Sequence, residues 1–317
     1  MVSESIQSPE DELDFAGACQ SAGCVAYIGG YNASMDTIVQ TVTDYGMYYW
    51  GAERGLDEQF ADNEYYLGGF RALGSDGTET GEGGDYLLGY ELAYSLAEQG
   101  CKHVVYCNGG AGFGIPMFVD RQNGFFAGIE AAKAAGMEIQ FDPEKDIVDG
   151  WPGTDTFTAA QSTVLSADYD GIACSFSGME IWVQPIADQG KSDTMKLAGV
   201  GSLSDATGAL IESGQIASLI YECEEIVFGN AIPMIINAVN GHGDLVKGQE
   251  GYCDLGVARW NIKTYEEFAS VNEKHEAGEY YVTAEDMKQF FPEFNKDASK
   301  ESFLSFYSGL TLEHVTK

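Results

Sequence analysis

Residues 101–108 read CKHVVYCN, residues 109–114 form the glycine-rich stretch GGAGFG, and residues 121–136 read RQNGFFAGIEAAKAAG. An apolar run with valines, a glycine turn and an alanine-rich amphipathic segment predict a strand, a loop and a helix, the repeating half of a parallel α/β layer. The loop follows the carboxyl end of its strand, where open α/β sheets bind small ligands.

Arg121 lies in the connection or at the start of this predicted helix, which makes it a candidate ligand contact. A planar guanidinium with five donors suits the hydroxyls or the carboxylate of a small ligand. In so acidic a chain, a solvated arginine or an ion pair is the alternative.

The composition is that of a globular protein with a large core. The chain has 317 residues, of which 44% are hydrophobic and 12% aromatic, and this length favours two lobes over one. Its 16 basic and 50 acidic side chains give a formal charge of -34, which repels phosphodiester backbones, so we expect no nucleic-acid partner. No apolar run approaches the roughly 20 residues that span a bilayer. The start MVSESIQSPEDELDF has neither the basic nor the apolar region of a secretory leader.

Cysteines and histidines indicate neither a disulfide scaffold nor a metal centre. The seven cysteines are odd in number and scattered, and none forms a CxxC pair. Buried free thiols are therefore predicted. The four histidines show no metal-ligand spacing to one another. We expect neither a metal nor any other cofactor.

Helix and strand alternate along the first part of the chain. Ser8, Pro9 and the acids after them predict a helix that begins near Pro9. The elements expected there are a helix to Gly23, strand 24–31, helix 32–46, strand 47–55 and strand 70–76. Strand 24–31 is apolar along most of its length, as expected of a parallel strand that is paired on both sides. Glycine-rich residues 78–85 mark a lobe boundary.

A second alternation of helix and strand follows, and the pattern becomes less distinct beyond Gly241. The expected elements are helix 86–100, strand 101–108, helix 121–136, strand 137–141, helix 155–167, strand 171–176, helix 179–190, strand 195–201, helix 204–213, strand 216–221, helix 225–240 and strand 254–260. The tail adds helices 265–277, 284–291, where Thr283 is the N-cap, and 300–310.

Catalytic motifs are missing from the sequence. It contains no GxSxG nucleophile elbow, no GxxxxGK phosphate loop and no HExxH, so we expect no enzyme. Aromatic residues at strand ends are more informative, because flat rings beside hydrogen-bonding groups suit sugars and nucleosides. We expect some of these rings to face a ligand: Tyr27, Tyr31, Tyr48, Tyr49, Trp50, Trp151, Phe176, Trp182 and Tyr221.

The order of motifs from roughly Pro9 to Gly241 resembles the type I periplasmic binding proteins, the ribose- and galactose-type substrate-binding components of ABC transporters. LGSD at residues 73–76 and GYELAYSLAEQG at residues 89–100 resemble that family's first lobe crossing and the helix after it. CKHVVYCNGG followed by RQNGFFAGIEAA is similar to its strand, glycine loop and R-x-x-G-F signature. DGIACSFSGMEIWVQPIADQG and MKLAGVGSLSDATGALIESGQIASLIYE resemble its following strand and helix pairs.

The resemblance implies a two-lobe fold. It is an α/β protein of two doubly wound parallel-sheet lobes joined by a multi-strand hinge, with a helical C-terminal extension. Expected boundaries are 1–76 plus 223–253 for an incomplete N-terminal lobe, 77–222 plus 254–262 for the C-terminal lobe, and 263–317 for a helical tail packed on the lobes.

Ligand contacts are implied position by position. Arg121 stands on the family's binding arginine, and Glu53 and Arg54 stand where members often have Asp-Arg. Ser177 replaces the usual asparagine, Gly201 the aspartate, and Tyr221 or Glu222 the glutamine. These departures argue against a simple pentose or hexose. The remaining candidates from strand ends are Tyr31, Asn32, Trp151 and Phe176.

Family members begin with a strand, a helix and another strand before the helix that starts here at Pro9. A lobe without its central strand exposes unpaired backbone, so a homodimer through that edge is expected. A truncated or mis-started chain, a missing part supplied by another copy, and a rearranged lobe are the three explanations.

The resemblance thus implies an extracytoplasmic solute-binding protein, periplasmic or lipid-anchored, although the sequence shows no signal of its own. It captures a small polar ligand, sugar-like or nucleoside-like, in an interlobe cleft by hinge bending and delivers it to a membrane ABC permease. The alternative is the ligand-sensing domain of a regulator or chemoreceptor system. An α/β enzyme is a weaker alternative.

Overall fold

The computed structural model describes residues 1–2, 6, 8–29, 33–52, 58–75, 77 and 83–317. The chain divides into two compact units and passes between them several times. Unit 1 comprises Met1–Ala72, Cys223–Ala258 and Tyr280–Leu310, and unit 2 comprises Leu73–Glu222, Arg259–Glu279 and Thr311–Lys317. The lobe boundaries expected from the sequence stay a prediction. The expected tail is divided between the units, because residues 280–310 belong to unit 1.

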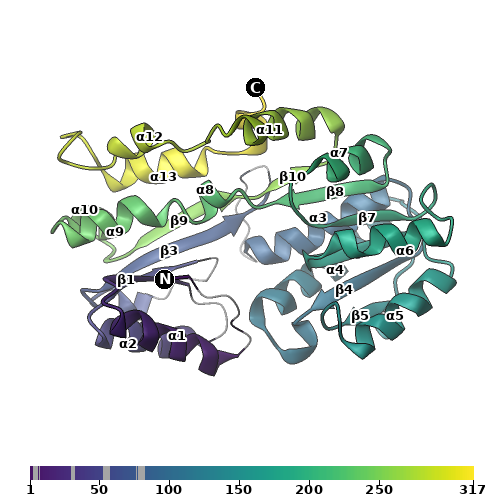
Figure 1. Ribbon diagram of the computed structural model, residues 1–317, viewed down its shortest axis with the longest axis horizontal. Helices are drawn as coiled ribbons and strands as arrows, with labels where there is room; N and C mark the ends of the chain where they lie inside the picture. The colour runs from purple at the N-terminus through teal and green to yellow at the C-terminus, as the bar shows by residue number, and fades with distance from the viewer. Residues whose placement is uncertain (3–5, 7, 30–32, 53–57, 76, 78–82) are drawn as a thin grey trace. The chain divides into compact units, whose positions relative to one another are not determined.

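Unit 1 is a sheet with helices on both faces (Figure 1). Its elements are α1 (Pro9–Ser21), β1 (Ala26–Gly29), α2 (Met35–Asp44), β2 (Tyr48–Gly51), η1 (Glu58–Phe60), β3 (Tyr66–Leu73), α8 (Glu224–Val227), α9 (Ala231–Val239), α10 (Gly243–Lys247), β9 (Cys253–Ala258), α12 (Ala284–Lys288) and α13 (Lys300–Ser308). The strand order is β1-β2-β3-β9, with β1, β2 and β3 parallel. Among the described strands, β1 therefore pairs with β2 alone and lies at the edge of the sheet, as expected for a strand whose natural neighbour is missing from the sequence.

Alternation along β2 sends neighbouring side chains to opposite faces of the unit 1 sheet. Tyr49 lies in the core beneath α1 and α2, stacked between Tyr27 and Tyr66 at centroid distances of 6.4 and 6.0 Å. On the other face, Trp50 donates from Nε1 to Asn230 beside α9 at 2.9 Å. The two faces are thus covered by different helices, as in a doubly wound layer.

Unit 2 carries the larger sheet. Its elements are α3 (Gly84–Glu98), β4 (Val104–Gly109), η2 (Ala111–Phe113), α4 (Pro116–Ala134), β5 (Ile147–Asp149), α5 (Asp155–Ser166), β6 (Gly171–Ser177), η3 (Met179–Trp182), α6 (Val183–Asp188), β7 (Lys196–Val200), α7 (Asp205–Glu212), β8 (Ile216–Tyr221), β10 (Trp260–Ile262), α11 (Tyr265–Ala277) and α14 (Leu312–Val315). The strand order is β10-β8-β7-β6-β4-β5, parallel except that β10 runs antiparallel to β8.

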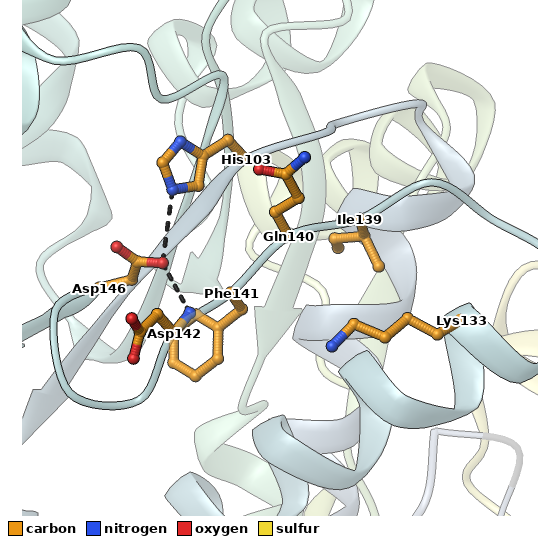
Figure 2. Close-up of a pocket in the computed structure, with 7 residues that line it drawn as sticks. All are labelled: His103, Lys133, Ile139, Gln140, Phe141, Asp142 and Asp146. Carbon is orange, nitrogen blue, oxygen red and sulfur yellow. Dashed lines mark hydrogen bonds and ion pairs between the residues drawn. The ribbon is translucent and has the colours of Figure 1, made fainter.

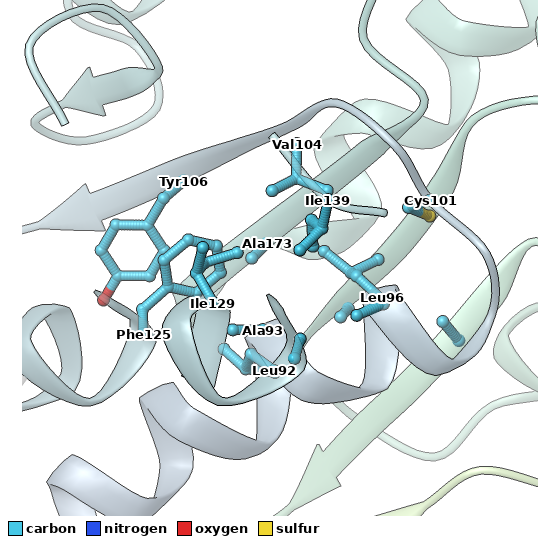
Figure 3. Packing of buried hydrophobic residues seen from close by; sticks show 14 of the residues in the cluster. Leu92, Ala93, Leu96, Cys101, Val104, Tyr106, Phe125, Ile129, Ile139 and Ala173 are labelled. Carbon is cyan, nitrogen blue, oxygen red and sulfur yellow. The ribbon is translucent and has the colours of Figure 1, made fainter. Parts of the chain in front are cut away.

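The core of unit 2 forms where α3 and α4 pack on one face of this sheet (Figure 3). Leu92 and Leu96 from α3 and Phe125 and Ile129 from α4 are completely or almost completely buried. Tyr106 of β4 stacks on Phe125 with a centroid distance of 4.4 Å. Parallel strands with helices on both faces confirm the predicted α/β class.

One sequence expectation in unit 2 was wrong in detail. Instead of a strand at 137–141, only Gln140 bridges to His103, and the strand lies later, at β5. A tight turn separates them, because the Asp146 amide donates to the Asp142 carbonyl at 2.8 Å and the Asp142 amide donates to the Asp146 carboxylate at 2.7 Å.

The single apolar helix expected at 225–240 is broken into α8 and α9. The side chain of Asn230 donates to the carbonyls of Ile226 and Val227 at 2.6 and 2.8 Å. These bonds satisfy the carboxyl end of α8 and end it there.

Other predictions from the sequence hold. Ser8 caps α1 by accepting from the Asp11 amide, and Thr283 forms a capping box with Asp286. All cysteines are free, and all except Cys24 are buried. Among the described residues, no helix is long and apolar enough to cross a membrane.

Candidate functional site

The carboxyl ends of the parallel strands in unit 2 meet at one edge of its sheet, which we call the carboxyl edge. The residues that end or follow β4, β5, β6, β7 and β8 lie here: Asn108, Asp149, Trp151, Phe176, Ser177, Gly201, Tyr221 and Glu222. Most of the described candidates from the sequence belong to this set. The fold therefore brings together residues that are up to about a hundred positions apart.

Arg121 lies in the second turn of α4 rather than in the connection, since the helix begins five residues earlier with Pro116 at its first position. The residue is buried, with 4% of its surface exposed. Its Nε donates to Oδ1 of Asp85 at 2.9 Å and its Nη1 donates to the Ser175 carbonyl at 2.7 Å. The guanidinium also lies 5.4 Å from the centroid of the Phe118 ring. Of the roles that the sequence left open for Arg121, the structure shows the ion pair. Ligand contact by Arg121 stays a prediction.

A second arginine shares the same carboxylate. Arg259 donates from Nη2 to Oδ1 of Asp85 at 3.0 Å and from Nε to Glu222 at 3.0 Å. Nη2 of Arg121 lies 3.9 Å from Glu222. We call these four residues the ionic cluster.

Burial favours the neutral form of Asp85, but the charges and hydrogen bonds of Arg259 and Arg121 outweigh it. The pKa of Asp85 is therefore lowered from its usual value of 3.8. Sequence reading missed Asp85 and Arg259, because the pairing joins segments 174 positions apart.

An aromatic group lies next to Arg121. Trp151 packs edge-on against Phe118, with a centroid distance of 5.1 Å and an angle of 76°, and against Phe176 at 5.3 Å and 69°. Phe118 and Phe176 are buried, whereas Trp151 is half-buried. Two buried rings thus fix the orientation of a third that remains partly accessible.

Polar side chains lie on the strands beside this ring. The buried amide of Asn108 donates from Nδ2 to Asp149 at 2.6 Å and to Gln122 at 3.3 Å. Its Oδ1 is buried and has no hydrogen-bond partner among the described atoms. Asp149 itself is exposed and can accept from a ligand's hydroxyl groups. Gln122 and Asp149 were not predicted, although Gln122 is adjacent to Arg121 and Asp149 lies two positions before Trp151.

The remaining predicted contacts have different environments. Ser177 is exposed at the end of β6, and Gly201 is half-buried after β7. Tyr221, at the end of β8, is half-buried with its ring 6.0 Å from that of Trp260. Tyr31, Asn32, Glu53 and Arg54 lie outside the described residues.

Several strand-end aromatics are core residues, which leaves fewer of these rings for the expected ligand-facing role. Tyr27, Tyr49 and Trp50 are buried in unit 1, and Trp182 is completely buried in unit 2. Tyr48 begins β2 and donates to the Ala238 carbonyl at 3.2 Å. The sequence pattern did not separate these rings from Trp151, because buried strands also carry aromatics at their ends.

A depression of about 300 Å³ lies at the opposite, amino edge of the unit 2 sheet (Figure 2). His103 precedes β4 and Asp146 precedes β5, and the His103 ring lies 3.4 Å from the Asp146 carboxylate. Tyr169 also donates to Asp146, at 2.6 Å. Because these polar groups bond to one another, we assign them a structural role in the turn before β5. A second hollow of about 410 Å³ in unit 1 includes Tyr48, Glu64 and Lys247.

Comparison with known sequences found no match: no protein-family model and no curated protein matches the chain. Solved structures do match. An ABC transporter periplasmic solute-binding protein from Actinobacillus succinogenes with bound D-allose has a TM-score of 0.60 and 18% identity, with 83% of this chain and 85% of that chain covered. An ABC transporter solute-binding protein from Bacillus halodurans with bound myo-inositol has a TM-score of 0.56 and 16% identity, covering 85% and 83%.

The Escherichia coli transcriptional repressor ascG also matches, with a TM-score of 0.55, 13% identity and coverage of 83% and 86%. At these identities the matches show the fold and do not by themselves assign a function. The fold of this chain is that of the type I periplasmic binding proteins.

Proposed function

We propose that the protein is a solute-binding protein that captures a small, neutral, polyhydroxylated ligand of the sugar class at the carboxyl edge of unit 2. The observation that carries this proposal is the half-buried Trp151 ring, held edge-on by Phe118 and Phe176 and lying two positions after Asp149. A fixed aromatic face next to carboxylate and amide groups suits a ring that is apolar on its faces and carries hydroxyls at its rim.

Charge balance favours a neutral ligand. The arginines of unit 2 are Arg121 and Arg259, and both are paired with carboxylates in the ionic cluster. An anionic ligand would meet no unbalanced positive charge from these arginines, and the chain as a whole carries -34. Sugars, inositols and nucleosides fit this balance better than uronates or sugar phosphates.

Transport supplies the biological setting of the proposal. The role is delivery of the ligand to a membrane ABC permease, with an extracytoplasmic location and closure of the protein on its ligand. Solute-binding proteins with this fold carry D-allose and myo-inositol in solved structures. A homodimer through the edge of β1 belongs to the same proposal, since β1 pairs on one side only among the described strands.

A ligand-sensing domain of a regulator is the second candidate, because the repressor ascG matches over a similar share of the chain. The charge of -34 argues against direct contact with DNA. Both candidates bind a small molecule without turnover, so the same first experiment separates them from an enzyme.

That experiment is a thermal-shift screen of the purified chain with neutral pentoses, hexoses, inositols and nucleosides, together with mass spectrometry of molecules released by denaturation. A neutral sugar-class compound that raises the melting temperature and is recovered unchanged supports the proposal. Turnover of that compound, or no shift with any member, contradicts it. Reconstituted uptake with candidate permeases then distinguishes transport from sensing.

A further inference from the structure

The chain passes between the two units at five points. At three of them unit 2 begins at Leu73, ends at Glu222 and begins again at Arg259. Such connections are the places where a two-unit protein changes conformation. We therefore asked what holds each of them within unit 2.

Two carboxylates of α3, those of Asp85 and Glu91, hold the first and third connections directly and the second through Arg259. Glu91 accepts from the amide and the hydroxyl of Ser75 at 2.9 and 2.8 Å, and from Nδ2 of Asn261 at 3.1 Å. Asp85 accepts from Arg259, which in turn donates to Glu222. The first connection is thus held by Glu91, the second by Arg259, and the third by both Asp85 and Glu91.

Asp85 also holds Arg121, and both arginines use the same oxygen, Oδ1. The side chains are nearly enclosed, with 5% of Arg121, 4% of Arg259 and 13% of Asp85 exposed. At this burial, replacing the carboxylate partner of either arginine with water carries a large free-energy cost. The position of each guanidinium therefore depends on the other through one atom.

We infer that Arg259 is a positioning residue for ligand binding: by sharing Oδ1 of Asp85 it fixes the guanidinium of Arg121 at the carboxyl edge, and links it to the chain connection at residue 259. This inference rests on the proposed function for its ligand arm, whereas the geometry can be tested without a ligand. When Arg259 is removed, Oδ1 of Asp85 is no longer shared, and of these two arginines Arg121 is the one left on this carboxylate. The guanidinium then turns toward a two-bond contact with Asp85, and away from the Ser175 carbonyl and the Phe118 ring.

The test uses the full chain with Arg259→Met, Arg259→Lys and the matched control Arg71→Met. Arg71 pairs with Asp254 in unit 1 at 2.8 Å, with side chains 26% and 44% exposed. The first readout is the Nε–H NMR resonance of Arg121, assigned by its loss in Arg121→Lys. We expect it to move and to exchange faster with water in Arg259→Met, to stay close to its original position in Arg259→Lys, and to be unchanged in Arg71→Met.

The second readout is affinity for D-allose, myo-inositol and the strongest neutral binder of the screen. Arg259→Met should weaken binding roughly tenfold, Arg259→Lys by less, and Arg71→Met not at all. If the Met variant does not fold, Arg259→Gln, which keeps an N–H donor without the charge, replaces it with the same expectations.

An Arg121 resonance that stays in place in Arg259→Met overturns the positioning role. A displaced resonance with unchanged affinity also overturns it, because the position of Arg121 would then have no effect on ligand binding. A displaced resonance in a protein that binds no neutral compound supports the shared-carboxylate geometry and contradicts the proposed function instead.

Discussion

Gly124 of α4 lies so close to Tyr86 of α3 that a Cβ atom at position 124 would overlap the Tyr86 carbonyl oxygen. Gly89 makes the same close approach from α3, where a Cβ would overlap the carbonyl of Arg121. Two glycines thus allow the helices to pack backbone against backbone. This packing brings Arg121 within hydrogen-bonding distance of Asp85, so the glycine in RQNGF serves the arginine three positions before it.

Gly124→Ala is expected to destabilise unit 2 by about 3 kcal/mol or more, because the obstructing atoms are backbone and the two helices must separate. Gly243→Ala is the matched control, since its Cβ meets nothing within 4 Å, and it should change stability by less than about 1 kcal/mol. Urea unfolding followed by circular dichroism measures both. Equal midpoints for the two variants would refute the close-packing account.

Arg121→Ala should destabilise the apo protein by about 3 to 5 kcal/mol, because it leaves a nearly enclosed carboxylate with one of its two charged partners. Removing an arginine that only lined a cleft would leave the stability of the apo protein nearly unchanged, since such a residue takes little part in the core. Arg71→Ala, which breaks the more exposed pair with Asp254, should cost about 0 to 1 kcal/mol. Thermal and urea unfolding of both variants check the contrast, and a small loss for Arg121→Ala would mean that the ionic cluster is dispensable.

Stability should depend on pH through Asp85. Its pKa is lowered in the folded protein relative to the usual 3.8, so its ion pairs contribute stability fully above that value. The contribution is lost as pH falls below about 4 and through the lower, folded-state pKa. The gap in unfolding free energy between the parent and Asp85→Asn should therefore be constant from about pH 7 to pH 5 and shrink below about pH 4. A gap that persists unchanged into stronger acid contradicts this assignment.

Trp151→Ala should weaken binding of the neutral ligand by roughly ten- to a hundredfold, since aromatic stacking and the buried area of the ring are lost. Its effect on stability should be smaller than that of Phe176→Ala, because Trp151 is half-buried and Phe176 is buried. Tyr265→Ala, an exposed ring on α11, serves as the control and should leave affinity unchanged. Calorimetric titration of the three variants separates the roles, and an unchanged affinity for Trp151→Ala would remove this ring from the site.

Local patterns were enough to predict most of the fold. The valines of β4, the cap at Ser8 and the alternation of strand and helix each depend on near neighbours in sequence, and the structure confirms them. The break between α8 and α9 was missed because it depends on what one side chain, Asn230, does to the carbonyls before it. Apolar residues stand on both sides of that break, which favoured a single helix.

The candidate site was predicted less well, because its chemistry arises from long-range pairing. The sequence singled out Arg121 but not Asp85 or Arg259, which lie 36 positions before it and far beyond it. Strand-end aromatics that lie in the core were also not separated from the partly accessible ones. Burial separates Trp151 from Trp50 and Trp182, and burial is decided by which helix covers each strand.

The most direct measurement of the central claim is isothermal titration calorimetry of the purified chain with paired ligands: each neutral sugar that stabilises the protein, and the uronic acid derived from it. The pair differs by one carboxylate, so it tests whether the paired arginines leave a site for a neutral polyhydroxylated ring. We expect the neutral sugar to bind without turnover and its uronate to bind at least roughly a hundredfold more weakly. A uronate that binds as tightly as the neutral sugar, or more tightly, would contradict the account.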